Sequence, residues 1–251
     1  MRTTWTSRVL ADFSDASRRY DTLVPLQRAI ARRLAGHCAR QNIPPGLWVD
    51  LGSGTGLLAD ALESLHPGQS VLRLDGSAAM LARHGADHRT ATMDLSCDLP
   101  RWQPSPTLLA SSFTLHWLPS PERRLLHWLH RLDANGWLAL SVPIQGSFPQ
   151  WHQAAADAAL PCTALPLPSG ADLIERLPRS TLHTCRTLRF TQTADHPLHL
   201  LKPMAAIGAG STPATQLTAA AWRKLFQAWP RQKPGRQAGL TWHVMLLLLK
   251  R

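Results

Sequence analysis

Val49-Asp50-Leu51-Gly52-Ser53-Gly54-Thr55-Gly56 is the stretch of sequence that decides the fold. The apolar run Leu47 to Leu51 predicts a short buried strand, and apolar residues return at helical spacing from Leu57 to Leu65. Three glycines therefore lie where the chain turns from a strand into a helix. Glycine at such a turn lets the backbone approach a ligand closely, because no side chain stands in the way.

Strands and helices alternate on the C-terminal side of this loop, which predicts a parallel sheet covered on both faces. The expected strands are Ser70 to Asp75, Arg89 to Asp94, Thr107 to Ser112 and Gly136 to Val142, with helices over Ala78 to His84 and Glu122 to Leu132. From Gly146 the rhythm changes. Helical stretches over 149–160, 170–177, 197–208 and 215–229 flank a strand over 181–190 and precede a last strand over 240–249. Such inserts predict a helical lid above the carboxyl ends of the strands, where this kind of sheet binds its ligands.

Acidic residues end three successive strands of the predicted sheet: Asp50, Asp75 and Asp94. We expect Asp50 to accept from an ammonium group, Asp75 to accept from both hydroxyls of a ribose, and Asp94 to reach an adenine amino group. The Gly-x-Gly-x-Gly spacing also differs from the Gly-x-Gly-x-x-Gly of nicotinamide enzymes. Together these features favour S-adenosylmethionine as cofactor, although Asp94 taken alone is also compatible with a helix N-cap. The predicted cofactor-binding residues are Asp50, Gly52, Ser53, Gly54, Gly56, Asp75, Asp94 and Ser112.

His116 and Trp117 follow the fourth predicted strand, in the run Ser111 to Trp117. Methyl transfer takes place at this position in folds of this kind, so the two rings are candidates to wall the transferred methyl group. Packing in the core explains the same residues equally well.

Composition bounds the remaining possibilities. The 251 residues carry a formal net charge of +11, which favours an acidic partner: nucleic acid, an anionic membrane surface or an acidic carrier protein. A composition that simply prefers arginine explains the charge about as well. No apolar run approaches the roughly 20 residues that span a bilayer, and no signal-peptide pattern is present, so we expect a cytoplasmic protein. The four cysteines are far apart and suggest neither disulfides nor a metal site.

Several stretches outside the glycine loop resemble the malonyl-acyl carrier protein O-methyltransferases of biotin synthesis, a family with the class I S-adenosylmethionine-dependent methyltransferase fold. The resemblance rests on Phe13 to Asp21 with Leu26-Gln27, on Val142 to Ala154 with its Gln145-Gly146-Ser147, on Leu200-Leu201-Lys202 and Ile207-Gly208-Ala209, and on Trp229-Pro230 with Leu240 to His243. This chain departs from the family at Pro106-Thr107, at the extra residues Pro203 to Ala206, and at Gly76, where leucine or isoleucine is common.

The resemblance implies an α/β fold: a Rossmann-like, seven-stranded sheet with helices on both faces, an N-terminal helical cap and a helical lid between the late strands. It implies one domain over residues 1–251, divided into cap (1–45), cofactor-binding core (46–145), lid helices with the sixth strand (146–239) and last strand (240–251). The implied reaction is methylation of the free carboxylate of malonyl-acyl carrier protein, at the start of pimeloyl synthesis for biotin. Malonyl-CoA is a possible further substrate.

The chemistry of the implied reaction needs no general base, because a malonyl carboxylate is already ionised at pH 7. It needs desolvation and in-line alignment, and hence aromatic walls, hydrogen-bond donors and a cation for the carboxylate. We expect Tyr20, Gln145 and His116 in the catalytic site, with Tyr20 closing it. Ser147 and Lys202 are further candidates, and Arg179 or Arg186 could clamp the carboxylate.

An acidic carrier protein as partner would also account for the positive net charge. We expect a basic rim made by Arg18, Arg19, Arg28, Arg32 and Arg33, with Arg223 or Lys224. Three alternatives remain open. They are methylation of another small acid or a quinone, methylation or binding of nucleic acid, and a non-catalytic scaffold. Nucleic acid is disfavoured, because aromatic residues are not interleaved with the basic ones and no Asn/Asp-Pro-Pro-Tyr/Phe motif follows the fourth strand.

Overall fold

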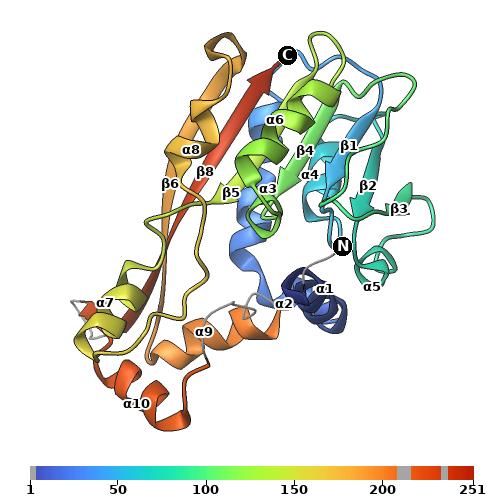
Figure 1. Cartoon of the computed structure of the whole chain (residues 1–251). Coiled ribbons are helices and arrows are strands. Elements are labelled where there is room, and N and C mark those ends of the chain that lie inside the picture. The colour runs from blue at the N-terminus through green and yellow to red at the C-terminus, as the bar shows by residue number, and fades with distance from the viewer. Residues whose placement is uncertain (1–3, 208–215, 233–236) are drawn as a thin grey trace.

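A computed structural model describes residues 4–207, 216–232 and 237–251, and it is built around one mixed sheet (Figure 1). The strands run in the order β3-β2-β1-β4-β5-β8-β6, and the two-residue β7 pairs with β8 at the side. Their bounds are β1 Trp48–Leu51, β2 Val71–Asp75, β3 Thr90–Thr92, β4 Leu108–Ser112, β5 Trp137–Pro143, β6 Leu182–Ala194, β7 Arg231–Gln232 and β8 Gln237–Lys250. The main path confirms the seven-stranded Rossmann-like sheet that the sequence predicts.

The direction of the strands fixes where a ligand can bind. β1 to β5 pair in parallel, whereas β8 runs antiparallel to both β5 and β6. The strand order reverses between β1 and β4. β2 and β3 follow β1 on one side of the sheet, whereas β4 and β5 lie on the other side of β1. Open sheets of this kind bind ligands at the carboxyl ends of the strands beside that reversal.

Two hydrophobic clusters lie on opposite faces of the sheet. Side chains of a strand alternate between faces, so Trp48 of β1 belongs to one cluster and Val49 to the other. The first face is covered by α3 (Pro25–Cys38) and α4 (Leu57–Leu65), and the second by α6 (Pro121–Arg131). The short α5 (Ala78–Leu81) packs beside β2. Leu57–Leu65 agrees with the helix predicted behind the glycines.

The N-terminal part of the chain, for which the resemblance implies a helical cap over 1–45, is helical. It consists of α1 (Thr4–Ala16), the one-turn α2 (Tyr20–Leu23) and α3, which begins at Pro25. Proline is favoured in the first turn of a helix, where its missing N–H would have no partner in any case, so Pro25 starts α3 instead of interrupting it. Figure 1 shows α1 and α2 near the lower ends of β1 and β2.

The late helices pack against different elements of the fold. α9 (Pro197–Ala206) packs near α2, at the carboxyl end of the sheet. α8 (Gly170–Glu175) instead packs against α6, α7 (Pro149–Asp157) packs against β8, and α10 (Ala219–Gln227) packs against α7. Short 3-10 turns lie at Leu115–Trp117 and Arg179–Thr181. Only α9 therefore remains as a lid element among the described helices.

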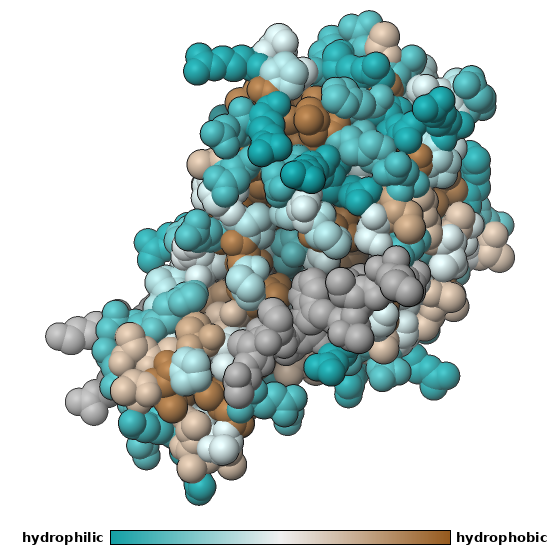
Figure 2. All heavy atoms as spheres, in the orientation of Figure 1, coloured by the Kyte–Doolittle hydropathy of each residue, from teal (hydrophilic) through white to brown (hydrophobic). Residues whose placement is uncertain are grey.

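The long β6 and β8 carry α7 and α10 away from the rest of the sheet (Figure 1). Figure 2 shows hydrophilic side chains over much of the upper part of this face and hydrophobic residues among those at the lower left, where α7 and α10 lie. Trp151 of α7 packs there against Trp222 of α10 and against Trp229, with tilted rings whose centroids lie 6.2 and 6.4 Å away. No helix among the described residues is long and apolar enough to cross a membrane.

Candidate active site

Three adjoining cavities open at the carboxyl ends of β1, β2 and β4, and Tyr20 and Phe113 line all three. The main cavity is lined by Leu10, Phe13, Asp75, Gly76 and Asp94, among others. The loop cavity is lined by Asp50, Gly52, Ser53, Gly54, Thr55 and Ser112, among others. The aromatic cavity is lined by Phe13, His116, Trp117, Phe148, Met204 and Trp242, among others. Tyr20 and Phe113 thus mark the junction where the three spaces meet.

The glycine loop, residues 52–56, is folded back on β2 through its backbone. The N–H groups of Gly52 and Ser53 donate to the Leu74 carbonyl at 2.8 and 2.9 Å. Gly52 has a φ of +76°, and a Cβ there would collide with Thr114. Gly54 has a φ of +53°, and a Cβ there would meet no atom within 4 Å. The loop therefore leaves open space beside Gly54, as a backbone that cradles a ligand requires.

Asp50 is buried beneath the loop at the end of β1. The residue is 1% exposed, and neither of its carboxylate oxygens has a hydrogen-bond partner. Burial raises the pKa of Asp50 from 3.8 to about 7, an effect that the charge of Arg73 and the nearby Ala59 N–H partly oppose. A buried carboxylate without partners is costly, so Asp50 is prepared for a cationic or hydrogen-bond-donating ligand group in the loop cavity.

Asp75 ends β2 and faces the main cavity. Its Oδ2 accepts from the Gly54 N–H at 2.9 Å, and its Oδ1 accepts from the Ser77 N–H at 2.8 Å. Desolvation raises its pKa, while these N–H groups act in the opposite direction. The two backbone bonds hold the carboxylate in place and leave further lone pairs for hydroxyl groups of a ligand.

Asp94, Ser112, Ser53 and Gly56 complete the predicted cofactor-binding set. Asp94 lines the main cavity, and its Oδ1 also accepts from the N–H and the hydroxyl of Ser96. The hydroxyl of Ser112, which lines the main and loop cavities, accepts from that of Ser141 at 2.8 Å. The buried Ser53 hydroxyl has no partner. Gly56 lines none of the three cavities; instead, a Cβ there would come within 2.8 Å of Arg73 Nη1.

The aromatic cavity offers hydrogen-bond donors but no charge. No Lys, Arg, Asp or Glu lines it among the residues that the structure describes; its polar side chains are Tyr20, Gln27 and His116. Burial raises the pKa of Tyr20 above its usual value and lowers that of His116 to about 3, so both are neutral at pH 7. His116 Nδ1 is buried without a partner. The prediction of a cation beside the acceptor is not met here.

The structure does not bring Gln145 and Ser147 to this site. β5 ends at Pro143, Gly146 takes a φ of +94°, and the exposed Gln145 contributes a backbone N–H to the Pro168 carbonyl. Ser147 is buried and accepts from the His243 N–H at 2.8 Å, which ties the turn to β8. Both residues therefore shape the end of β5, and neither lines the aromatic cavity.

The predicted carboxylate clamps also lie elsewhere. Lys202 is exposed on α9, and Arg179 and Arg186 are exposed on the 3-10 turn before β6 and on β6 itself. None of the three lines a cavity of the site. Ile207 lines the aromatic cavity, whereas Gly208 and Ala209, which belong to the same predicted segment, are outside the described residues.

Phe113 and Gln27 are among the lining residues that were not predicted as site residues. Phe113 has a φ of +56°, a conformation that a bulky residue rarely adopts, and its ring lies 6.0 Å from that of Trp242. Gln27 of α3 lines both the loop and the aromatic cavities. A conformational outlier of this kind has no sequence signal. Gln27 lies within the stretch whose resemblance the sequence reveals, but its role depends on how α3 approaches β1.

The arrangement fits S-adenosylmethionine. The loop cavity, with the unpartnered Asp50, suits the amino-acid part, and the main cavity, with Asp75 and Asp94, suits the ribose and adenine. The sulfonium methyl would then lie near the junction of Tyr20 and Phe113.

Comparison with known proteins points the same way. Residues 49–140 match the family model described as a methyltransferase domain. The chain is 28% identical over 212 residues to a malonyl-[acyl-carrier protein] O-methyltransferase of Neorickettsia risticii. The matched region covers 82% of this chain and 83% of the relative. It is 35% identical over 114 residues to a trans-aconitate 2-methyltransferase of Mycolicibacterium gilvum. That matched region covers 43% of this chain and 42% of the relative.

The fold is shared with solved structures as well. A SAM-dependent methyltransferase from Thermotoga maritima superposes with a TM-score of 0.51 at 14% identity, covering 95% of this chain and 98% of the other. The matched domain includes the glycine loop, Asp75 and Asp94. Residues 49–140 therefore form a methyltransferase domain, and the chain shares the fold of an S-adenosylmethionine-dependent methyltransferase.

Proposed function

We propose that this protein methylates the free carboxylate of malonyl-acyl carrier protein and so forms the methyl ester that begins pimeloyl synthesis for biotin. One observation carries the proposal. The cavity on the acceptor side of the Tyr20–Phe113 junction is aromatic, and its described lining holds donors but no charged group. Similarity to a malonyl-[acyl-carrier protein] O-methyltransferase over 82% of the chain supports it.

The reaction asks little acid–base chemistry of the protein. Bound S-adenosylmethionine supplies an electrophilic methyl group on a cationic sulfur. A carboxylate oxygen attacks the methyl carbon, so that an O–C bond forms, the C–S bond breaks and its electron pair stays on sulfur. No proton is transferred, because the acid is already ionised at pH 7. The side chains must therefore bind, orient and exclude water.

The uncharged lining suits that task. A carboxylate beside a guanidinium would be stabilised in the ground state and would be a poorer nucleophile. In the aromatic cavity the anion would lose water and meet the donors Tyr20, Gln27 and His116, so that its main counter-charge is the sulfonium itself. Of the three residues predicted for catalysis, Tyr20 and His116 keep this role in the proposal, and Gln27 replaces the exposed Gln145.

The cofactor roles belong to the proposal as well. Asp50 would accept from the methionyl ammonium, with Gly52, Ser53, Gly54 and Ser112 beside it. Asp75 would accept from the ribose hydroxyls, and Asp94 would face the adenine. Gly56 acts indirectly, by leaving room beneath the loop.

A basic surface would receive the acidic carrier protein. Arg18, Arg19, Arg32 and Arg33 are exposed on the N-terminal cap, and Arg28 and Arg32 line an open groove between α3 and α4 with the exposed Leu65. Arg223 and Lys224 are exposed on α10, which Figure 1 shows beyond α9 and away from α3. The proposed docking surface therefore includes the cap arginines and excludes the two on α10.

Incubation with S-adenosylmethionine and malonyl-acyl carrier protein, followed by mass spectrometry, tests the proposal directly. The expected product carries one additional methyl group that mild alkali removes, because it is an ester; a C-methyl group would survive. Trans-aconitate is the second acceptor to test, since relatives with that activity are 34–40% identical over shorter stretches. Methylation of trans-aconitate and not of the malonyl substrate, by protein that binds the cofactor, would overturn the proposal.

A further inference from the structure

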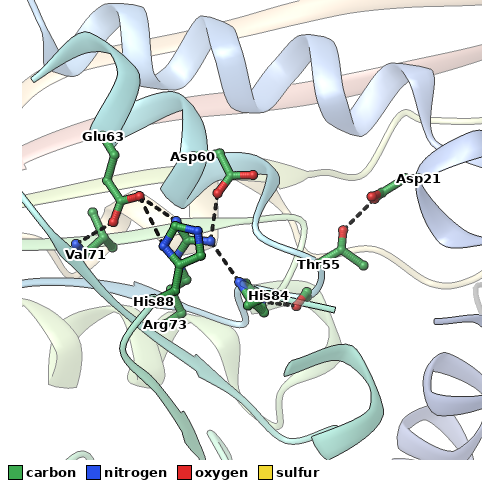
Figure 3. A network of polar contacts seen from close by, with 9 residues as sticks. Asp21, Thr55, Asp60, Glu63, Val71, Arg73, His84 and His88 are labelled. Carbon is green, nitrogen blue, oxygen red and sulfur yellow. Dashed lines mark hydrogen bonds and ion pairs between the residues drawn. The ribbon is translucent and has the colours of Figure 1, made fainter. Parts of the chain in front are cut away.

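A buried arginine lies directly beneath the glycine loop, outside the cavities described above. Arg73 is in the middle of β2 and is 1% exposed. Its Nη1 lies 2.7 Å from Asp60 Oδ1 and its Nη2 lies 2.6 Å from Glu63 Oε2, both on α4 (Figure 3). A paired guanidinium is the form in which a buried charge is tolerated, and two carboxylates hold this one in a fixed orientation.

Asp60, Glu63 and His88 are also close enough together to suggest a metal site. The guanidinium of Arg73 already occupies the space between the two carboxylates and supplies the positive charge (Figure 3). The cluster therefore has its cation, and it carries no metal proposal.

Arg73 determines the tautomer of His84. Its Nη1 lies 2.8 Å from His84 Nδ1, and a guanidinium can only donate, so Nδ1 must be the acceptor. His84 Nε2 lies 2.9 Å from the Gly54 carbonyl oxygen, which can only accept, so Nε2 must carry the hydrogen. Both contacts are possible only for a neutral ring protonated at Nε2.

Gly54 is thereby held on both sides. Its N–H donates to Asp75 Oδ2 at 2.9 Å, and its carbonyl accepts from His84. Gly56 makes this possible, since a Cβ there would lie 2.8 Å from Arg73 Nη1 and 2.9 Å from His84 Cε1. The last glycine of the motif thus makes room for the pair beneath the loop.

We propose that Arg73 and His84 are positioning residues for the cofactor, which hold Gly54 and through it the carboxylate of Asp75 in the binding geometry. Neither side chain lines the three cavities, so they act through the loop. The inference depends on the cofactor alone and is independent of the acceptor.

The proposal makes cofactor binding sensitive to acid. Burial lowers the pKa of His84, and the charges of Arg73 and His88 lower it further, while the Gly54 carbonyl and Asp60 oppose them. Asp75 is the other charged group that interacts with the ring. Because the folded pKa lies below the ordinary value, His84 is neutral at pH 7. As the pH falls through that lowered pKa, a proton on Nδ1 faces Arg73 and the link to the loop weakens.

Calorimetric titration with S-adenosylmethionine tests this in the wild-type protein and in His84→Gln, His84→Ala and His88→Gln, from about pH 8 to about pH 5. Glutamine can still donate to the Gly54 carbonyl but does not titrate. At pH 8 we expect His84→Gln to bind within about threefold of wild type and His84→Ala to bind about tenfold more weakly. His88→Gln is the matched control, because the His88 ring makes no bond to the loop, and it should bind like wild type at pH 8.

On the acid side, wild type should lose more affinity than His84→Gln. Asp50, which also titrates, is common to both proteins, so the difference reports on His84. Thermal melting without cofactor separates a loss of folding from a loss of binding. Nitrogen NMR of the wild-type histidines gives an independent readout, with His84 expected as the Nε2–H tautomer. Equal affinities of wild type and His84→Ala at pH 8, identical pH profiles of wild type and His84→Gln, or the opposite tautomer would each overturn the proposal.

Discussion

Thr55 of the glycine loop donates a hydrogen bond of 2.5 Å from its Oγ1 to Oδ1 of Asp21 in α2 (Figure 3). This bond joins the loop to the N-terminal cap, one residue beyond Tyr20, which lines all three cavities. Arg28 holds the same segment from α3, because its Nη2 donates to the Asp21 carbonyl at 3.0 Å. The position of Tyr20 is therefore tied to the position of the loop.

Removing this link should weaken cofactor binding without damaging the fold. We expect Asp21→Ala and Thr55→Val each to lower S-adenosylmethionine affinity about three- to tenfold, the usual net size of one intramolecular hydrogen bond. The double variant should be no weaker than the worse single one, because both remove the same bond. Calorimetry measures the three affinities, and strictly additive losses would show that the bond does not couple cap and loop.

Replacing Asp50 should affect folding stability and cofactor binding in opposite directions. Its folded pKa of about 7 lies above the ordinary 3.8, so the folded cofactor-free protein holds a proton that the unfolded chain releases. The free energy of unfolding should therefore decline as pH rises from about 4 to about 7, by on the order of 4 kcal/mol. Asp50→Asn removes this loss. We expect the variant to melt at a higher temperature than wild type at pH 8, without cofactor.

The same substitution should nearly abolish cofactor binding, since an amide presents an N–H group and no charge to the methionyl ammonium. Wild-type affinity should fall as the pH drops below about 7 and Asp50 takes up a proton. Melting curves and calorimetry over the same pH series check both statements. A variant that melts lower than wild type at pH 8, or that binds the cofactor normally, would contradict this account of Asp50.

The sequence predicts the position of a site residue well where that position depends only on which elements follow one another along the chain. Strand, glycine loop and helix follow one another within residues 47–65, so the place of Asp50 at a strand end can be read from periodicity. Asp75 follows from the same reasoning for the next strand, and it does line the main cavity. Parallel strands then bring their carboxyl ends to one edge, whatever the distant packing is.

The parts that were missed depend on backbone directions and on contacts between distant segments. Gln145 is exposed beside the turn at Gly146 and lines none of the three cavities. Phe113 reaches the junction through an unusual φ, and Arg73 reads in the sequence as one polar residue inside a strand. Its partners Asp60 and Glu63 lie on α4, and only the packing of α4 against β2 reveals them.

Leu10 and Gly76 form a second pair between the cap and the core. Both line the main cavity, and a Cβ on Gly76 would come within 2.8 Å of Leu10 Cδ2. Leu10 of α1 therefore occupies space that a side chain at position 76 would need. We expect Gly76→Leu to displace α1 and to weaken cofactor binding at least tenfold, and Leu10→Ala to weaken it severalfold by opening the wall.

The double variant Leu10→Ala/Gly76→Leu provides the test of this pair. Because the new leucine would fill the space that Leu10 leaves, it should bind the cofactor better than Gly76→Leu alone. Calorimetry and thermal melting measure the recovery. If the double variant loses as much cofactor-binding free energy as the two single variants lose together, the two residues do not share one space.

Tyr20→Phe tests the junction itself. The variant keeps the ring and loses only the hydroxyl, which is buried and protonated because burial and the nearby Asp75 raise its pKa. If the hydroxyl orients the acceptor, kcat should fall about tenfold while the cofactor Kd changes less than threefold. Single-turnover kinetics together with cofactor calorimetry separate the two effects. A loss confined to cofactor affinity would assign Tyr20 to cofactor binding and not to the acceptor.

Charge reversal on α3 tests where the carrier protein binds. Arg32→Glu/Arg33→Glu changes two exposed residues and spares Arg28, whose guanidinium supports Asp21. Association of oppositely charged surfaces depends on steering, so we expect a KM for malonyl-acyl carrier protein raised about tenfold at low salt, with kcat retained and the difference shrinking as salt rises. Arg223→Glu/Lys224→Glu is the matched control: it makes the same change in net charge on α10, which lies away from the cap in Figure 1. If both double variants raise the KM for malonyl-acyl carrier protein alike, the effect is due to net charge alone. If Arg32→Glu/Arg33→Glu raises the KM for malonyl-CoA as much as that for the carrier-bound substrate, the arginines act on the site and not on the carrier protein.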